Sequence, residues 1–299
     1  EFLFISYETD FEEIKLMAQA IINKLYEPYL IKQYTFILGS SIGISQFPKN
    51  GTTFDEIKRY ADIAMYESKI EKNKYTIFNE DIKNKYLEKA LIEQELKYAL
   101  AKNEIYMMYQ PQVDINGSLY GVEALVRWEN KKLGFVPPDK FIKIAEEIGL
   151  MGKLGSFVIE TSLAEIKNLQ NEMNIDFHLS INISVKQFME VKFYEELIKC
   201  IEKTKFDKAK ITLEITANIF INDVNYILSI LNKLRKNGIC ISMDDFGTGY
   251  SSLSLLKKLP IDELKIDKSF VDDIIDDKNA LSMVTSIITI AKNLDMLVL

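Results

Sequence analysis

The chain has 299 residues, of which 47% are hydrophobic and 27% are charged. Because these fractions are close to the averages of soluble globular proteins, they exclude a disordered tail, a collagen-like repeat and a small disulfide-bonded scaffold. The net charge of −7 at pH 7 gives no support to a DNA or RNA polymer or an anionic membrane as the partner, so a phosphate-bearing ligand needs local cations or a metal ion.

Residues 1–80 predict a small α/β region. Apolar residues recur at helical spacing in two segments, and three other segments are rich in residues that favour strands. A loop marked by Pro48 and Gly51 precedes the second helix. The predicted strands are 2–7, 34–45 and 75–78, and the predicted helices are 11–25 and 54–70.

Residues 81–102 predict a charged amphipathic helix that caps the next domain; a coiled-coil relay is the alternative, but the run is too short to show heptads. From Glu104 onward strands alternate with helices, which is typical of a parallel sheet, either open or closed into a barrel. No window approaches the ~20 apolar residues of a membrane span. The predicted strands are 105–113, 119–127, 177–184, 211–216, 239–244, 263–267 and 296 onward, and the predicted helices are 139–149, 152–171, 191–203, 223–237, 251–258 and 277–293.

Polar residues stand near the C-terminal ends of five of these strands. In the strand 211–216, for example, isoleucine and leucine alternate with polar residues, so one face meets the helices and Glu214 lies on the other. In a (β/α)8 barrel the C-terminal strand ends form the active-site face. A single such residue is more often a helix cap or a surface residue, but five on successive strands favour a shared site. The five are Glu123, Asn182, Glu214, Asp244 and Lys265.

Three carboxylates and an amide oxygen, without histidine or thiolate, predict a site for a hard cation such as Mg²⁺ or Mn²⁺. Asp245, next in the chain, can bridge a second ion and position a water for phosphodiester hydrolysis. Lys265 and Arg127 supply positive charge for phosphate, although Arg127 taken alone favours a surface ion pair. The single histidine, His178, comes first on its strand and is predicted to be a core residue. The two cysteines, Cys200 and Cys240, favour a reducing compartment over a disulfide framework.

The segment Glu123-Ala-Leu-Val-Arg-Trp128 resembles the signature of the EAL family of cyclic di-GMP phosphodiesterases. The resemblance covers about 85–299, in the order of the family, and residues 1–80 resemble the later half of a GGDEF domain, with Glu1-Phe2 as the end of that motif. The further EAL-like motifs are Tyr109-Gln-Pro-Gln112, Asn182-Ile-Ser184 with Gln187, Leu213-Glu-Ile-Thr216, Asp244-Asp-Phe-Gly-Thr-Gly249 and Leu264-Lys-Ile-Asp267; the GGDEF-like blocks are Ser40-Ser-Ile-Gly-Ile44 and Ala61-Asp-Ile-Ala-Met-Tyr66.

The resemblance implies a (β/α)8 TIM-like EAL barrel at 103–299, whose first strand runs antiparallel, after a partial α+β GGDEF domain at 1–80 and a connecting helix at 81–102. It also implies hydrolysis of cyclic di-GMP to linear pGpG with Mg²⁺ or Mn²⁺, in the cytoplasm, by a homodimer that forms near Asp245–Gly249. The implied metal ligands are Glu123, Asn182, Glu214, Asp244 and Asp245; the implied catalytic residues are Glu123, Asp245 and Lys265; and the implied substrate-binding residues are Gln110 and Arg127.

The sequence departs from the family pattern at several points. Ala217 stands where the family has a second glutamate, three residues after Glu214. Both ends look cut, so we expect an incomplete barrel that lacks its last strand and helix and a GGDEF half without cyclase activity. Ala217 therefore keeps an alternative open, in which a degenerate EAL module binds cyclic di-GMP or a partner without hydrolysing the nucleotide. A third possibility is hydrolysis of another cyclic dinucleotide.

Overall fold

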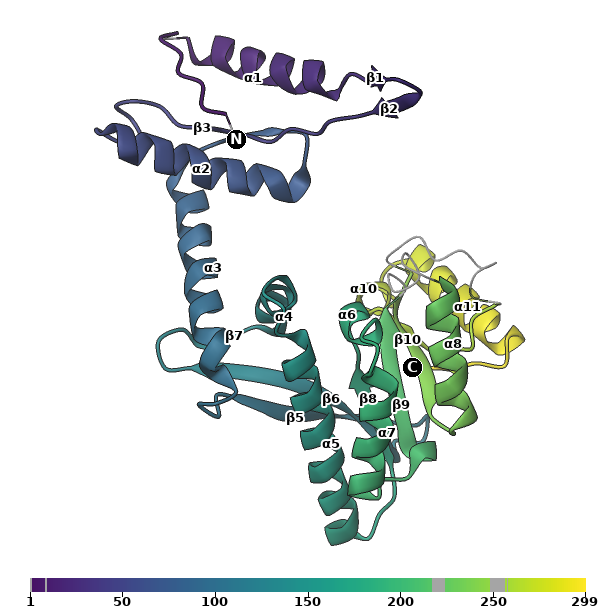
Figure 1. Cartoon of the computed structure of the whole chain (residues 1–299). Coiled ribbons are helices and arrows are strands. Elements are labelled where there is room, and N and C mark those ends of the chain that lie inside the picture. The colour runs from purple at the N-terminus through teal and green to yellow at the C-terminus, as the bar shows by residue number, and fades with distance from the viewer. Residues whose placement is uncertain (1, 9, 217–223, 248–255, 257) are drawn as a thin grey trace. The chain divides into compact units, whose positions relative to one another are not determined.

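The computed structural model describes residues 2–8, 10–216, 224–247, 256 and 258–299, and the predictions for Ala217 and for most of the helix 251–258 lie outside these residues. The chain forms two compact units, Glu1–Ile92 and Glu93–Leu299, and the boundary falls inside helix α3 (Glu80–Ala99; Figure 1). None of the described helices combines the length and apolar character needed to cross a membrane.

The first unit contains two small two-stranded sheets and two long helices. One sheet is an antiparallel hairpin and the other a parallel pair. A capping box between Thr53 and Glu56 begins the second helix, which buries Ile63 and Ala64 against Phe78. The elements are α1 (Phe11–Tyr26), β1 (Tyr29–Ile31), β2 (Tyr34–Phe36), β3 (Ile42–Ile44), α2 (Phe54–Glu71) and β4 (Tyr75–Ile77).

The strand predicted at 2–7 is wrong. None of the described residues 2–8 belongs to a strand, and large apolar side chains there, such as Phe2 and Tyr7, are exposed. Strand-favouring residues form a strand only when a neighbouring strand accepts their backbone hydrogen bonds. The other predicted elements of this unit are present; the segment 34–45 divides into β2 and β3.

The second unit is built on a single sheet with the strand order β5-β6-β8-β9-β10-β11-β12, and β7 pairs with the outer part of β6. The β5–β6 pair is antiparallel, as the resemblance implies, and the pairs from β6 through β8 to β12 are parallel. The strands are β5 (Ile105–Val113), β6 (Leu119–Asn130), β7 (Gly134–Val136), β8 (His178–Asn182), β9 (Ile211–Thr216), β10 (Cys240–Phe246), β11 (Glu263–Ile266) and β12 (Leu297–Val298); the helices are α4 (Pro138–Glu147), α5 (Met151–Met173), α6 (Val185–Phe188), α7 (Phe193–Thr204), the 3₁₀ turn Lys208–Lys210, α8 (Val224–Lys236), α10 (Lys268–Val271) and α11 (Lys278–Asn293).

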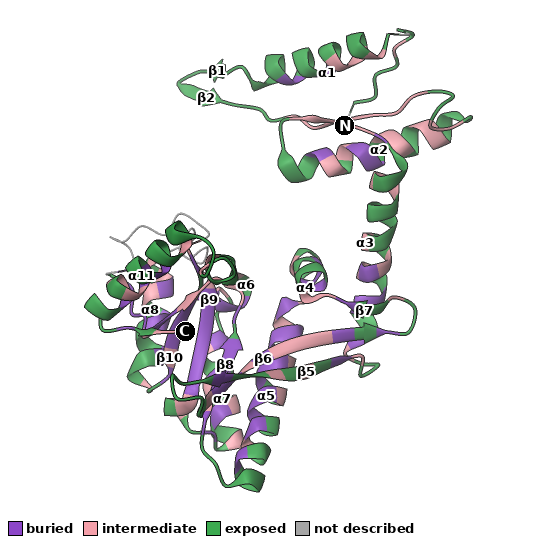
Figure 2. Ribbon diagram, turned by 180° about the vertical axis from the view of Figure 1, so that it is seen from behind, coloured by how far each residue is buried: buried purple, intermediate pink, exposed green. Residues whose placement is uncertain are grey.

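The main hydrophobic core lies between this sheet and its covering helices. Helix α5 contacts β5, β6 and β8, helix α8 contacts β10, and helix α11 contacts β11 and β12. Figure 2 shows β9 buried along most of its length, and in β8 the central residues Leu179–Ile181 are buried. In β9, Ile211, Leu213 and Ile215 belong to this core, which leaves Thr212 and Glu214 for the opposite face. The predicted alternation therefore places the polar residues of the strands on the inner face of the sheet.

Candidate metal and active site

Five neighbouring strands bring the five predicted polar residues together. Glu123 lies in β6, Asn182 ends β8, Glu214 lies in β9, Asp244 in β10 and Lys265 in β11. The β8–β9 register sets Asn182 opposite Glu214. Carboxylate oxygens of Glu123, Glu214 and Asp244 all lie within 4.8 Å of one another. The sheet thus concentrates three carboxylates that are far apart in the sequence.

Lys265 is the cation at the centre of this trio. Its Nζ lies 3.1 Å from Oε2 of Glu123 and 3.3 Å from Oδ1 of Asp244, and it also donates to Oε2 of Glu214. The amide of Asn182 donates to Oε1 of Glu123 at 2.8 Å. One ammonium group therefore faces three carboxylates, and the cluster carries an excess of negative charge when all are ionised.

Burial makes this excess of negative charge less favourable. Glu214 is 1% exposed, and its Oε1 is buried without a hydrogen-bond partner. Burial raises the pKa of Glu214 to about 8; the ammonium of Lys265 opposes the rise, while the nearby carboxylates of Glu123 and Asp244 reinforce it. Burial alone would lower the pKa of Lys265, but the carboxylates of Glu214 and Asp244 outweigh it and raise that pKa. The lysine is therefore charged, and proton loss from Glu214 is disfavoured without a further cation.

The donor set fits a hard divalent cation. The trio offers only oxygen ligands, which Mg²⁺ and Mn²⁺ prefer, and the unpartnered Oε1 of Glu214 is a buried acceptor that a cation would satisfy. Two more positive charges would also offset the two carboxylates that Lys265 leaves unbalanced. Glu123, Glu214 and Asp244 would bind the ion directly, and Asn182 stands beside Glu123.

Asp245 lies next to the trio but is not part of it. Its backbone is left-handed, with a φ of 53°, a conformation that aspartate adopts more readily than most residues. Burial and the nearby carboxylates of Asp244 and Asp267 raise the pKa of Asp245. Asp267 also accepts the Ser269 N–H and begins α10. Asp267 is not among the predicted site residues, although the Leu264-Lys-Ile-Asp267 motif contains it.

Gly247, just after the Asp244–Asp245 segment, lies close to helix α10. Its φ is 108°, and a Cβ there would lie 2.5 Å from the ring of Phe270 in α10. Only glycine combines this backbone conformation with such a close approach. Thr248 and Gly249, which complete the predicted dimer segment, lie outside the described residues.

The two predicted substrate-binding residues lie on the same face of the sheet as Glu123. Gln110 of β5 is directly opposite Glu123 in the antiparallel pair and is exposed. Arg127 is four residues further along β6, so its side chain projects from the same side. The guanidinium of Arg127 is half-buried and donates to its neighbouring carbonyl, Val126 O, at 2.9 Å. Both side chains therefore project from the face of the sheet that carries the trio.

His178 lies at the other end of β8 from Asn182. Its ring stacks on Tyr120, with centroids 4.5 Å apart, and burial lowers its pKa. The imidazole is thus removed from the carboxylate trio and favours the neutral form, as a packing residue does. Both cysteines are free and half-buried.

Two family models match the chain. The EAL domain model matches residues 93–299, and the model of the diguanylate cyclase, GGDEF domain, matches residues 1–74. The chain belongs to the EAL domain family. The resemblance noted from the sequence motifs is therefore confirmed.

Curated relatives match nearly the whole chain. The bifunctional diguanylate cyclase/cyclic di-GMP phosphodiesterase MucR of Pseudomonas aeruginosa is 30% identical over 298 residues, 99% of this chain and 44% of that protein. The cyclic di-GMP phosphodiesterase PdeR of Escherichia coli is 31% identical over 300 residues, 100% of this chain and 45% of that protein. The chain thus spans less than half the length of either relative.

Solved structures share the fold of the EAL unit. The MucR phosphodiesterase in its cyclic di-GMP complex is 32% identical, with a TM-score of 0.66 over 70% of this chain and 85% of that one. The EAL enzyme Bd1971, bound to cAMP and cyclic di-GMP, is 34% identical, with a TM-score of 0.68 over 72% of this chain and 59% of that one. The predicted TIM-like EAL fold is confirmed.

Proposed function

We propose that the protein hydrolyses cyclic di-GMP to linear pGpG with Mg²⁺ or Mn²⁺. The observation that carries this proposal is the convergence of Glu123, Glu214 and Asp244 around a single lysine on the inner face of an EAL-family sheet. An excess of buried carboxylate charge without histidine or thiolate suits a hard cation, and such ions promote phosphodiester hydrolysis. The relatives MucR and PdeR are both cyclic di-GMP phosphodiesterases, which supports the choice of substrate.

Each residue of the site has a role in this proposal. Glu123, Asn182, Glu214, Asp244 and Asp245 hold the metal, which when bound activates water and offsets phosphate charge. Asp245 orients the attacking water, because its carboxyl lies beside the trio and outside it. Lys265 donates to the water or to the scissile phosphate. The water oxygen bonds to phosphorus as the bond between phosphorus and the 3′ oxygen breaks. The departing 3′ oxygen takes the proton that the water gives up.

Gln110 and Arg127 hold the substrate in this proposal. Arg127 presents a guanidinium on the inner face of the sheet, and a planar pair of N–H donors suits a phosphate. Gln110 is exposed opposite Glu123, where an amide can donate to or accept from the nucleotide. Both residues would act on binding more than on the chemical step.

The organisation around the site is also part of the proposal. Residues 1–80 form a partial GGDEF domain, residues 81–102 a connecting helix and residues 103–299 the phosphodiesterase barrel. The protein works in the cytoplasm as a homodimer that forms near Asp245–Gly249. Size-exclusion chromatography with light scattering, with and without cyclic di-GMP, tests the dimer.

Chromatographic detection of pGpG tests the reaction. Cyclic di-GMP is incubated with Mg²⁺ or Mn²⁺ and either residues 1–299 or the product of the complete gene. We expect pGpG with metal and none after chelation. A panel of other cyclic dinucleotides tests the substrate preference. Binding of cyclic di-GMP without turnover, at saturating metal and with the complete product, would contradict the proposal and select a binding-only module.

A further inference from the structure

A glutamine side chain lies directly against the backbone of helix α5. Gly155 is buried in α5, and a Cβ built on it would lie 1.6 Å from Nε2 and 2.3 Å from Cδ of Gln187. Real Cβ atoms do not approach a neighbour so closely, so this contact requires glycine at position 155. Gln187 is itself 5% exposed, which leaves its side chain little room to move aside.

The same glutamine fixes the turn that follows strand β8. The side-chain Oε1 of Gln187 accepts a hydrogen bond from the Ser184 N–H at 3.2 Å. The backbone N–H of Gln187 donates to Oγ of Ser184 at 3.3 Å. This reciprocal capping box begins the short helix α6. Gln187 therefore contacts α5 with one part of its amide and fixes the start of α6 with the other.

The turn leads directly to the metal ligands. Ser184 is two residues after Asn182, whose amide donates to Glu123. The residue between them, Ile183, donates its N–H to the carbonyl of Glu214 at 2.9 Å. A shift of the capping box would thus move Asn182 relative to both Glu123 and Glu214.

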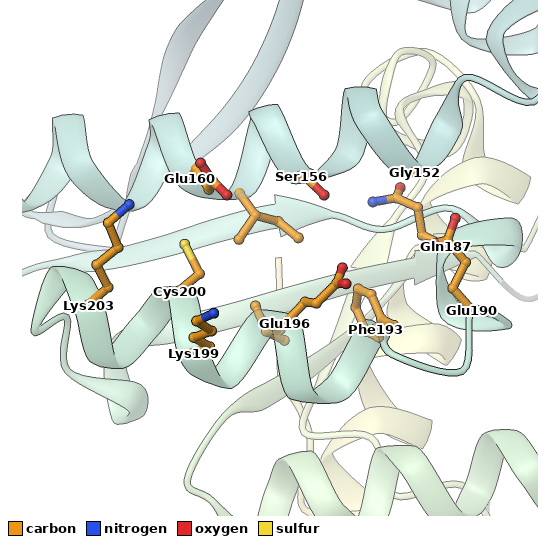
Figure 3. Close-up of a pocket in the computed structure, with 12 residues that line it drawn as sticks. Gly152, Ser156, Glu160, Gln187, Glu190, Phe193, Glu196, Lys199, Cys200 and Lys203 are labelled. Carbon is orange, nitrogen blue, oxygen red and sulfur yellow. The ribbon is translucent and has the colours of Figure 1, made fainter.

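Gln187 also borders a cleft outside the sheet. The cleft of about 270 Å³ lies between α5 and α7, and Gly152, Glu160, Gln187 and Cys200 are among its lining residues (Figure 3). Figure 3 shows the Gln187 side chain directed at α5. None of the trio lines the cleft, which is therefore separate from the site of the proposed chemistry.

We propose that Gly155 and Gln187 are positioning residues for the metal site. Their close contact holds the β8–α6 turn, and the turn places the Asn182 amide beside Glu123. The inference rests on the proposed function, because it assumes that these residues bind a divalent ion. It adds two residues that touch neither metal nor substrate. A purely structural role would change the stability of the fold and leave the affinity of the folded protein for metal unchanged.

The variant Gly155→Ala tests this inference, and Gly152→Ala is its matched control. Both substitutions add one methyl group to α5, but at Gly152 the nearest atom is the flexible carboxylate end of Glu190, at 2.8 Å. Direct Mn²⁺ binding is measured by electron paramagnetic resonance, with circular dichroism as the check of folding. We expect Mn²⁺ affinity to fall about 10-fold or more in Gly155→Ala, as for lost supports of metal ligands, and to change less than about twofold in Gly152→Ala.

The variant Gln187→Ala keeps the test decisive if Gly155→Ala does not fold. It removes the glutamine contact and leaves space, and we expect Mn²⁺ affinity to fall by a similar factor. In that background Gly155→Ala should have little further effect, because the clashing partner is gone; additive losses would contradict a shared contact.

The readouts separate this inference from the proposed function. A wild-type chain that binds Mn²⁺ but does not hydrolyse cyclic di-GMP contradicts the function, and the variants still decide the inference. Wild-type affinity in folded Gly155→Ala and Gln187→Ala overturns the inference alone. A wild-type chain that binds no Mn²⁺ overturns both.

Discussion

The EAL unit contains two clusters of buried carboxylate and lysine with opposite electrostatics. In the first, Glu95 of α3 accepts from two lysines, Lys132 and Lys102, and from Asn130. In the second, Glu214 shares the single lysine Lys265 with two other carboxylates. Glu95 is 4% exposed and Glu214 is 1% exposed, so both side chains are shielded from solvent.

The two clusters differ in how many lysines face each carboxylate, and the pKa values of Glu95 and Glu214 shift in opposite directions. Hydrogen bonds from Lys132 and then Lys102 lower the pKa of Glu95 to about 2, whereas burial raises the pKa of Glu214 to about 8 despite Lys265. A carboxylate with two cations is satisfied by the protein itself and ties α3 to the β6–β7 hairpin. A group of three carboxylates around one cation is balanced either by a proton or by a further cation, and carboxyl groups of this kind cluster at ligand sites.

The largest expected effect is on the rate of hydrolysis, which should depend on the Glu214 cluster and not on the Glu95 cluster. Glu123→Gln removes one ligand of the trio without changing its size, and we expect hydrolysis of cyclic di-GMP to fall by about 1,000-fold, because charge stabilisation at the phosphate depends on the bound ion. Glu95→Gln makes the same chemical change in the other cluster and should leave kcat unchanged. The measurement is the rate of pGpG formation at saturating Mn²⁺. Equal rates for the two variants would remove the distinction between the clusters.

The next effect concerns stability without metal. Lys265→Met leaves three close carboxylates without their cation, and we expect the free energy of unfolding in chelator to fall by roughly 3 kcal/mol, as when one partner of a buried ion pair is removed. Lys132→Met should have a much smaller effect, because Glu95 keeps Lys102 and Lys132 is mostly exposed. Urea denaturation with chelator and with saturating Mn²⁺ measures both. The loss in Lys265→Met should shrink when Mn²⁺ is present; an equal loss in both conditions would argue against a metal among these carboxylates.

The pH dependence of metal affinity gives a smaller, graded effect. Without metal the pKa of Glu214 is about 8, so below pH 8 this carboxyl is mostly protonated and must lose a proton when it binds a cation. Mn²⁺ affinity should therefore rise about 10-fold per pH unit below 8 and level off above it. Titrations by electron paramagnetic resonance at pH 6.5, 7.5 and 8.5 measure this slope. An affinity that is independent of pH across this range would show that no protonated carboxyl is displaced.

The sequence predicted much of this site because it is built on regular strands. The strands 105–113 and 211–216 have the predicted bounds, and period-two alternation places Glu214 on the inner face. Parallel strands put residues from distant parts of the chain at one edge, so the convergence of the trio follows from the pattern of elements. Residues 2–7 show the limit of the same reasoning, since a composition that favours strands does not supply a pairing partner.

The contacts that position the site could not be predicted in this way. Gly155 lies within a long helical pattern, where a glycine indicates only a weaker helix, and its partner Gln187 is on another element. The neighbourhood of Asp245 and Asp267 depends on how β10 and β11 end and on the left-handed backbone of Asp245. Such contacts depend on tertiary distances of an ångström or two, which neither periodicity nor motif spacing contains.

The smallest expected effect concerns the stability contributed by the Glu95 cluster, and it is seen only at acidic pH. The pKa of Glu95 falls from an ordinary 4.5 to about 2 on folding, so its ionised form stabilises the native state at any pH above 4.5. This contribution is lost progressively as the pH falls from 4.5 towards 2, because the unfolded chain then takes up the proton first. Glu95→Gln has no such proton to bind and should lose stability less steeply over that range, by a few degrees in Tm. Thermal unfolding of both proteins between pH 7 and pH 3 measures the difference; parallel curves would mean that Glu95 is no better paired in the native state than in the unfolded chain, and the contrast with Glu214 would rest on burial alone.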